Sequence, residues 1–296
     1  MNSVLITGCG DIGRRVARYI YNQAEANQVE ISGLIRREED SAALQSLNIK
    51  PVIADLDRPD TLLNVPTAGA TIFHLAPPPS TGQQDPRFRN LLNCCDANGQ
   101  PEKIVLLSTT AIYGDCKGQW IDETAEVNPQ TDRGRRRLDA ELALREWAEA
   151  RNVPYVIVRV SGIYGPGRLP VERLRQGLPI LREDLAPYSN RIHQDDLAMV
   201  CVAAAERANS GSIYNVCDGS PSTMSHYFKA IAKVLDLPMP PELNREQAEK
   251  QLSAGMLSYL NESRRLSNRK MIEELQITLK YPDLAAGLKN ITKENC

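Results

Sequence analysis

The feature that most constrains the fold is a glycine loop that joins a short apolar segment to an amphipathic one. Residues 3–7 read Ser-Val-Leu-Ile-Thr and are followed at once by Gly8-Cys9-Gly10-Asp11-Ile12-Gly13. Residues 14–23 come next, with apolar side chains at helical spacing at Val16, Ala17 and Ile20. A strand, a glycine turn and a helix in this order are typical of a parallel βαβ unit. The loop therefore predicts an α/β fold.

Apolar strand segments and helical segments alternate along most of the chain. Further strands are predicted at residues 29–35, 50–54, 70–75, 103–108, 154–160 and 212–216. Further helices are predicted at residues 40–47 and 138–150. The strands are nearly continuous apolar runs, as expected where both faces of a sheet are covered. Right-handed crossovers between them give a doubly wound parallel sheet, the Rossmann fold.

Two stretches interrupt this alternation and predict a smaller lobe. Residues 162–190 are rich in Gly and Pro, and residues 236–296 begin with three prolines within a few positions. We therefore expect a Rossmann domain over residues 1–161, with residues 191–235 also contributing to its sheet, and a small C-terminal substrate lobe. Ligands of such sheets bind beyond the carboxyl ends of the strands, where the lobe is expected.

Composition excludes several classes of protein. The chain has 296 residues, a net charge of −2 and 24% charged residues, which gives no basic surface for nucleic acid or an anionic membrane. No apolar run is long enough to cross a bilayer, and no signal segment precedes the first strand. The seven cysteines include no Cys-x-x-Cys pair, and no two histidines have metal-ligand spacing. Reduced thiols, a cytoplasmic location and no metal are expected.

The glycine loop has the fingerprint of a dinucleotide site. Gly8 permits the tight turn, Gly10 lets a pyrophosphate approach the backbone, and Gly13 lets the helix pack closely on the strand. The helix N-terminus adds free N–H groups and a positive dipole. The whole loop, including Cys9, Asp11 and Ile12, is therefore assigned to cofactor binding. The alternative is a plain β-turn-α connection.

The residues after the second strand indicate which dinucleotide is bound. An NAD site usually has an acidic residue there for the ribose 2′-hydroxyl, whereas this chain has Arg36 and Arg37, which suit a 2′-phosphate. NADP is therefore favoured over NAD; the alternative is a solvated surface pair beside Glu38 and Glu39. By position, Asp55-Leu56 is expected to border the adenine, and Ala76-Pro77 the cofactor further along.

Several segments together resemble the extended short-chain dehydrogenase/reductases, the group of nucleotide-sugar epimerases and dehydratases. They are the glycine loop and residues 107–114, 159–168, 191–198 and 214–218, which read LSTTAIYG, RVSGIYGPGR, RIHQDDLA and YNVCD. The resemblance covers nearly the whole chain. The glycine spacing departs from the G-x-x-G-x-x-G usual in extended members, which suggests an atypical branch.

The resemblance also shows what this chain lacks. Family members orient the substrate with a Ser or Thr after the fifth strand, here Thr109 with Ser108 beside it. Their Tyr-x-x-x-Lys dyad is replaced by Arg133 and Arg137. A guanidinium stays protonated, so Arg133 cannot serve as a general acid or base, whereas Arg137 can still anchor the cofactor. Tyr113 or Tyr164 is the candidate substitute proton carrier, and local packing of each phenol is the alternative.

The remaining polar residues are interpreted as structural. His74 ends a strand, His193 lies at a strand–helix junction, His226 is expected at the surface, and Asp195 is a candidate N-cap. The sequence thus predicts an NADP-binding oxidoreductase or epimerase-like enzyme with an atypical active site. Its substrate is a small molecule, with nucleotide sugars as one class. The alternative is a catalytically inactive, NADP-binding redox sensor. The resemblance also implies a homodimer.

Overall fold

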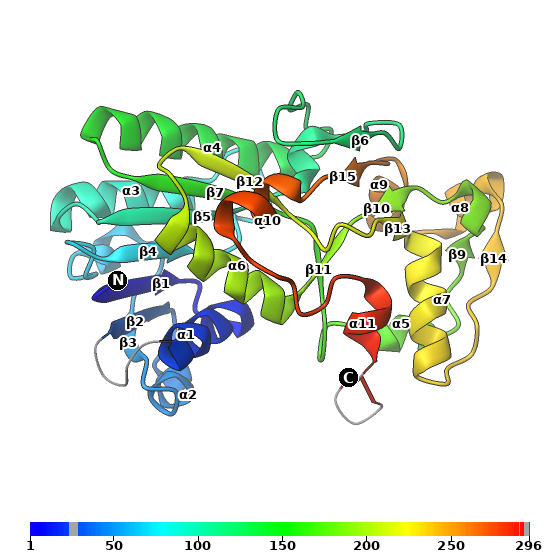
Figure 1. Ribbon diagram of the computed structural model, residues 1–296, viewed down its shortest axis with the longest axis horizontal. Helices are drawn as coiled ribbons and strands as arrows, with labels where there is room; N and C mark the ends of the chain where they lie inside the picture. Colours follow the sequence, from blue (N-terminus) through cyan, green and yellow to red (C-terminus); the bar gives the residue numbers. More distant parts are fainter. Residues whose placement is uncertain (24–28, 290, 293–295) are drawn as a thin grey trace.

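The computed structural model describes residues 1–23, 29–289, 291–292 and 296, so residues 290 and 293–295 of the predicted lobe lie outside the described residues. Its centre is a seven-stranded parallel sheet (Figure 1). The strand order is β12-β7-β5-β4-β1-β2-β3. The strands are β1 (Ser3–Thr7), β2 (Glu30–Ile35), β3 (Lys50–Ile53), β4 (Thr71–His74), β5 (Lys103–Thr109), β7 (Tyr155–Val160) and β12 (Ser212–Val216). The predicted doubly wound sheet is confirmed.

The strand order places a topological switch next to the glycine loop. β1 pairs in parallel with β2 on one side and with β4 on the other. The chain therefore winds outward in two directions from β1, and the carboxyl ends of β1, β4 and β5 lie side by side. Crevices at such a switch are where ligands of open α/β sheets bind.

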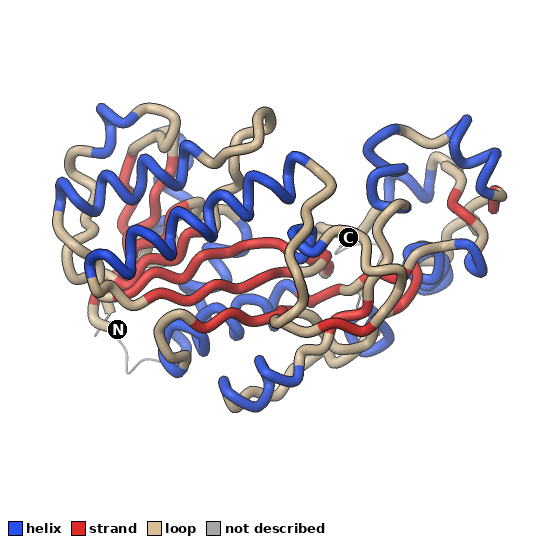
Figure 2. Tube along the Cα trace, turned by 90° about the horizontal axis from the view of Figure 1, so that it is seen from above, coloured by secondary structure: helices blue, strands red, loops and turns tan. Residues whose placement is uncertain are grey.

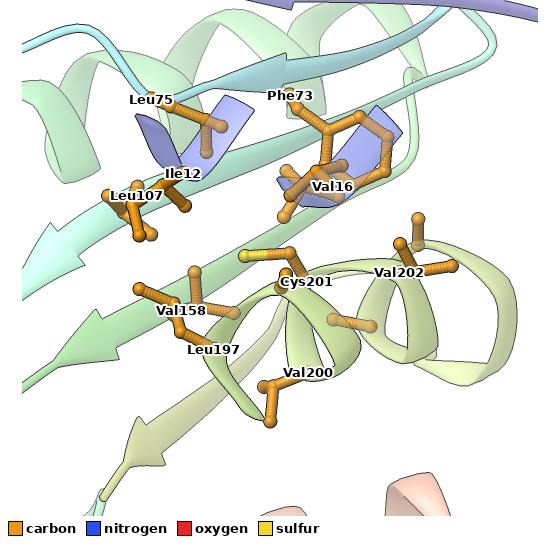
Figure 3. Close-up of a cluster of buried hydrophobic side chains, with 14 of the residues drawn as sticks. Ile12, Val16, Phe73, Leu75, Leu107, Val158, Leu197, Val200, Cys201 and Val202 are labelled. Atoms are coloured by element: carbon orange, nitrogen blue, oxygen red, sulfur yellow. The ribbon is translucent and has the colours of Figure 1, made fainter. Parts of the chain in front are cut away.

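Helices cover both faces of the sheet, and successive strand residues pack into two different cores. On one face lie α1 (Asp11–Gln23), α6 (Gln194–Arg207) and α10 (Arg269–Leu275); on the other lie α3 (Pro86–Asn98) and α4 (Asp132–Arg151). Figure 3 shows the first core, where Val16 of α1 lies near Phe73 and Leu197 of α6 lies near Val158 of the sheet. Within β1, Ile6 packs into this core and Leu5 into the other. Two-sided burial explains why the strands are continuous apolar runs.

Two local details differ from the expectations. Helix α3 is absent from the predicted set, although Asp85 caps it by accepting a hydrogen bond from the Phe88 N–H and Pro86 occupies its first turn. At the start of α6 the cap is His193, whose Nδ1 accepts from the Asp195 N–H at 3.2 Å, so the assignment of Asp195 as N-cap is wrong. The structural readings of His74 and His193, both buried, are confirmed.

Short elements form a second body at one end of the sheet, which Figure 2 shows beside the long strands. Its helices are α5 (Val171–Arg175), α7 (Met224–Val234), α8 (Arg245–Gln251), α9 (Ala254–Leu260) and α11 (Leu284–Leu288). Its strand pairs are β8 (Gly162–Tyr164) with β11 (Arg191–His193), β9 (Ile180–Leu181) with β14 (Glu242–Leu243), and β10 (Tyr188–Ser189) with β13 (Ser222–Thr223). A further pair joins β6 (Trp120–Ile121) to β15 (Arg265–Leu266). The remaining elements are the short helix α2 (Ser41–Gln45) and the 3-10 turns η1 (Glu38–Asp40), η2 (Pro59–Leu62), η3 (Thr110–Tyr113) and η4 (Glu183–Leu185).

The packing departs from the predicted domain boundaries in two segments. Phe228 and Ile231 of α7 lie in the core of the lobe, although residues 191–235 were expected to belong to the sheet domain. Conversely, Met271 and Leu275 of α10, with Leu279 beyond it, pack into the sheet core although they fall in the predicted lobe. The chain thus returns to the first domain after it has built part of the second.

The seven cysteines form no disulfide, and Cys9, Cys94, Cys95, Cys201 and Cys217 are buried. Burial raises the pKa of the Cys201 thiol to about 12. These thiols pack as small apolar groups. Within the described part of the chain, no helix is both long and apolar enough to cross a membrane.

Candidate functional site

Two cavities open beyond the carboxyl ends of the strands. The first, called here the glycine-loop cavity, has a volume of about 370 Å³. Its lining includes most of the predicted cofactor residues: Gly8, Cys9, Gly10, Arg36, Arg37, Asp55, Leu56, Ala76 and Pro77. The second, called the lobe cavity, has a volume of about 430 Å³ and includes Thr109 and Arg133. Both volumes are within the usual range for small-molecule sites.

The three positions Gly8, Gly10 and Gly13 are occupied by glycine for different geometric reasons. Gly8 has φ +83°, and a Cβ there would lie 2.4 Å from the Ala76 nitrogen. A Cβ on Gly13 would lie 2.9 Å from a methyl carbon of Ile6, so the helix packs close to β1 as expected. A Cβ on Gly10 would have no neighbour within 4 Å, because this position faces the cavity. The open space at Gly10, at the N-terminus of α1, fits a dinucleotide pyrophosphate.

The other loop residues hold the loop itself. Ile12 is buried in the sheet core. Asp11 accepts hydrogen bonds from Arg15 at 3.0 Å and from Arg168, in the loop after β8, at 2.9 Å. Burial opposes ionisation of Asp11, but the hydrogen bond from Arg168 and the charges of both arginines outweigh it and lower the carboxyl pKa. Asp11 and Ile12 do not line the cavity, so they support it from behind.

The two arginines after β2 differ in their ion pairs. Arg37 forms ion pairs with Glu39 at 2.7 Å and with Asp40 at 3.1 Å, and its side chain is 66% exposed. Arg36 lines the same cavity and has no ion pair with any described residue. Arg36 is therefore the free cation at the position where a 2′-phosphate would be read.

Arg137 lies behind the glycine-loop cavity and lines neither cavity. One of its amino groups donates to the Ala76 carbonyl at 3.0 Å, and its other amino group is 3.8 Å from the Asp85 carboxylate. Burial lowers the pKa of Arg137 to about 10, although the charges of Asp85 and Glu141 oppose the shift. The side chain holds the Ala76 backbone, and through it the cavity wall. Arg87 fixes the next stretch by donating to the carbonyl of Pro77 at 3.1 Å.

Thr109 is the predicted substrate-orienting residue, and it ends β5 at the lobe cavity. Its Oγ1 accepts from the Ala111 N–H at 3.3 Å, which leaves the hydroxyl proton available as a donor. Arg133 faces the same cavity from the first turn of α4, with its guanidinium 3.8 Å above the Tyr259 ring. Across the described residues Arg133 makes no ion pair. The structure therefore brings Thr109 and Arg133 to one cavity.

Ser108 and Tyr113, two of the predicted catalytic residues, are instead part of a buried polar network. Ser108 donates to Glu141 at 2.5 Å, and Glu141 pairs with Arg159 at 2.9 Å. Arg159 donates to the Tyr113 hydroxyl at 2.9 Å, and that hydroxyl donates to Asn215 at 2.7 Å. Neither side chain lines a cavity. This placement argues against Tyr113 as the proton carrier, because both hydrogen-bonding roles of its phenol are taken inside the protein.

Tyr164 borders the lobe cavity, but its hydroxyl is also engaged. It donates to the Asp283 carbonyl at 3.2 Å, and the side chain is 1% exposed. Burial, with the nearby carboxylates of Asp218 and Asp196, raises the pKa of Tyr164 well above its ordinary value. A phenol in this state is a poor proton acceptor at neutral pH. The structure thus brings neither candidate phenol to the lobe cavity in a reactive state.

Several residues of the lobe cavity were not predicted from the sequence, and Glu262 is the only Asp or Glu among the described residues that line it. Glu262 follows α9, lines the cavity, and has a side chain that is 4% exposed and ion-paired with Arg264 at 3.0 Å. Only the short Glu-x-Arg spacing near the C-terminal end could have indicated it. No metal site is present among the described residues, which contain no group of three or more His, Cys, Asp or Glu side chains able to hold an ion.

Comparisons with known proteins agree with this geometry. A solved structure of a functionally unknown conserved protein from Silicibacter pomeroyi DSS is 30% identical, with a TM-score of 0.80, over 98% of this chain and 97% of that one. Protein YeeZ of Escherichia coli K12 is 26% identical over 96% of this chain and 97% of its own length.

A more distant solved structure shares the fold. UDP-glucose 4-epimerase from Thermotoga maritima, solved with UDP-glucose, is 20% identical, with a TM-score of 0.77, over 97% of this chain and 96% of that one. The model of the NAD dependent epimerase/dehydratase family matches residues 4–217, which hold the glycine loop, β5 and α4. The resemblance found in the sequence is confirmed: this chain belongs to the NAD dependent epimerase/dehydratase family.

Proposed function

We propose that this protein is a nicotinamide-dinucleotide-dependent oxidoreductase or epimerase-like enzyme that acts on a small anionic molecule. The observation that carries the proposal is the pairing of two cavities at one edge of the sheet. Ala76 after β4 lines the glycine-loop cavity, and Thr109 at the end of the neighbouring β5 lines the lobe cavity. Adjacent strands thus end at the glycine-loop cavity, the proposed dinucleotide site, and at the lobe cavity, the proposed substrate site.

Each residue has a defined role in this proposal. Gly10 and the N-terminus of α1 hold the pyrophosphate, while Ala76 and Pro77 border the rest of the cofactor. The dinucleotide supplies hydride exchange when bound. Thr109 donates a hydrogen bond to the substrate. Arg137 fixes the cavity wall through the Ala76 carbonyl, which replaces the direct contact with the cofactor that the resemblance implies.

Arg133 favours an anionic substrate. The resemblance implies that it stands in place of the family's tyrosine; its guanidinium faces the lobe cavity and has no carboxylate partner in the described chain. Such a group cannot move a proton, but it binds phosphate or carboxylate strongly. Nucleotide sugars are one class that fits, since the Thermotoga maritima relative was solved with UDP-glucose.

The proposed preference for NADP depends on Arg36. The family description names NAD, so the preference is a property of this chain's own residues. We expect Arg36→Ala to weaken NADPH binding about tenfold and to leave NADH binding nearly unchanged. Arg37→Ala is the matched control, because Arg37 is already paired with Glu39 and Asp40. Equal affinities for NADH and NADPH in the wild type would contradict the preference.

Turnover is tested by following NADPH and NADH absorbance with a panel of nucleotide sugars and their keto derivatives. We expect activity that Thr109→Val abolishes and that Thr124→Val, at an exposed position outside both cavities, leaves unchanged. Failure to bind either dinucleotide would overturn the proposal. Gel filtration of the same preparation measures the oligomeric state, which tests the predicted homodimer.

A second candidate function is a redox sensor that binds the dinucleotide without turnover. The observation in its favour is the lack of a usable phenol: Arg133 replaces it, and the hydroxyls of Tyr113 and Tyr164 are engaged. The intact lobe cavity with Thr109 opposes it. Tight NADPH binding with no turnover on any carbonyl substrate would favour the sensor over the enzyme.

A further inference from the structure

Glu262 is an isolated carboxylate in a cavity lined by guanidinium groups. The lobe cavity includes Arg133, Arg191 and Arg264, and among the described residues that line it Glu262 is the only Asp or Glu. Its Oε2 accepts from both terminal nitrogens of Arg264, each at 3.0 Å. The charge of this wall is therefore only partly neutralised, and the carboxylate has a defined orientation.

The other carboxylate oxygen of Glu262 has no hydrogen-bond partner. Oε1 is buried, and no donor from the described protein reaches it, although the side chain is only 4% exposed. A buried carboxylate oxygen without a donor costs free energy, so such atoms are rare in native proteins unless a ligand or water satisfies them. Because Glu262 is one of the residues that line the lobe cavity, a ligand in that cavity is the candidate donor.

The loop that carries Glu262 is held firmly in place. The Ser263 N–H donates to the Asp115 carboxylate at 2.8 Å, and the Ser263 carbonyl accepts from the Gly118 N–H at 2.8 Å. Arg264 donates to the Gly114 carbonyl at 2.5 Å. These bonds tie the loop to the segment that follows η3, so Glu262 presents its free oxygen from a rigid support. A pre-organised acceptor of this kind is typical of a recognition site.

We propose that Glu262 is a substrate-recognition residue whose Oε1 accepts a hydrogen bond from a substrate hydroxyl, while Arg133 binds an anionic group of the same molecule. The ligand class is a hydroxylated organic anion, such as a sugar phosphate or a polyhydroxy acid. A hydroxyl fits better than an ammonium, because three guanidinium groups line the cavity and repel a cation. The proposal rests on the proposed function in so far as the lobe cavity is the substrate site.

The test uses probe pairs that differ in hydroxyl groups but not in charge. The pairs are glucose 1-phosphate against cyclohexyl phosphate, gluconate against hexanoate, and UDP-glucose against its cyclohexyl analogue. Calorimetry on the full chain should show that the wild type prefers the hydroxylated member of at least one pair by about tenfold or more. Glu262→Gln keeps the side-chain shape and an oxygen for Arg264 but turns an amide donor toward the ligand.

We expect Glu262→Gln to lose that preference while it binds the hydroxyl-free member as the wild type does. The matched control is Glu273→Gln, since the Glu273 side chain is 62% exposed and lies outside the lobe cavity. If Glu262→Gln does not fold, Arg264→Lys serves instead, because it keeps the charge and releases the carboxylate from its two-point contact. We expect Arg264→Lys to reduce the preference in part.

Two results would overturn the inference: a wild type that prefers no hydroxylated probe, or a Glu262→Gln variant that keeps the wild-type preference. The proposed function is tested separately by NADPH fluorescence, which measures whether the dinucleotide binds at the glycine-loop cavity. One outcome would be that the protein binds no dinucleotide but still prefers hydroxylated probes in a way that depends on Glu262. This outcome would contradict the proposed enzymatic function and support the proposed role of Glu262.

Discussion

The two cavities are built from different parts of the polypeptide. The glycine-loop cavity is formed by the glycine backbone after β1 and mostly by residues at or just after the ends of β2, β3 and β4, all within the first 87 residues. The lobe cavity is formed by side chains from β5, α4, β8, β11, α7 and α9, which span residues 109 to 264. A site made by backbone depends on a few glycines, whereas a site made by side chains can change its ligand without any change of fold.

The two cavities also differ in how their charged side chains are paired. In the glycine-loop cavity Arg37 and Arg87 are paired with carboxylates, whereas Arg14 and Arg36 form no ion pair with any described residue. In the lobe cavity Arg133 is unpaired among the described residues, and Glu262 keeps a free oxygen. The first site thus has two unpaired cations, Arg14 and Arg36, for the proposed cofactor. The second has several polar groups that, in the proposed function, would select the substrate.

The strongest test of the backbone-built site is Gly8→Ala. The residue has φ +83°, and the new Cβ would lie 2.4 Å from the Ala76 nitrogen and 2.6 Å from its Cα, so β4 would have to move. We expect the free energy of unfolding in urea to fall by about 3 kcal/mol or more. Gly177→Ala is the control: its φ is +62° with no atom within 4 Å, so it should cost only about 1 kcal/mol of backbone strain.

Gly10→Ala separates ligand binding from stability at the same loop. Its Cβ meets nothing within 4 Å and its φ is not positive, so unfolding should change by no more than about 0.5 kcal/mol. The methyl group would occupy the approach of the pyrophosphate, and we expect NADPH affinity to fall about 100-fold, or about 2.7 kcal/mol. Fluorescence titration measures this, and an unchanged affinity would show that no ligand approaches this backbone.

Arg133→Gln tests the side-chain-built site by itself. We expect glucose 1-phosphate to bind about tenfold more weakly, because the unpaired guanidinium is removed, and NADPH binding to stay the same. Arg135→Gln, two residues on in α4, serves as control, since Arg135 pairs with Asp132 at 2.9 Å and lines neither cavity. Equal losses for the two variants would indicate a general charge effect.

Asp218 makes stability depend on pH close to the lobe. Burial raises its carboxyl pKa to about 7, although Ser220 and Arg191 oppose the shift. The unfolded pKa is about 3.9, so its contribution to stability is fully present below pH 4 and is lost as the pH rises through 7. We expect Asp218→Asn to gain stability relative to the wild type between pH 5 and pH 8, by an amount of the order of 1 kcal/mol.

The difference in stability between the wild type and Asp218→Asn isolates the contribution of the Asp218 carboxyl group. His193, whose pKa burial lowers to about 4, destabilises both proteins as the pH falls below about 6.5 and therefore cancels in the difference. Urea unfolding curves at both pH values supply the measurement. A difference that does not vary with pH would mean that Asp218 is ionised normally in the folded protein.

The sheet and the glycine-loop cavity were predictable because their signals are local. A strand buried on both faces must be an apolar run, and a tight phosphate loop must have glycine where φ is positive or the ligand approaches. The predicted residues Arg36, Asp55 and Ala76 follow directly after strands, so the parallel topology alone brings them to one cavity. The place of His193 at a strand–helix junction was predictable for the same reason, but its capping role was wrongly assigned to Asp195.

The lobe cavity was not predictable, because its groups come together only through long-range packing. The Tyr113 hydroxyl is engaged by Arg159 and Asn215, which are far from it in sequence. Glu262 is a single carboxylate in a charged tail until Arg264 and the cavity wall surround it. Similarly, nothing in the pattern of residues 236–296 indicates that α10 leaves the lobe and packs on the sheet.

That return of α10 has a consequence for how the protein is made on the ribosome. Met271, Leu275, Ile277 and Leu279 close the face of the sheet core that α6 and β12 begin, so the first domain is incomplete when residue 217 has been synthesised. At about 5–20 residues per second, several seconds pass before these side chains leave the exit tunnel. During that interval α10 is missing from its place against α6 and β12, and the apolar side chains that it covers there stay open to solvent.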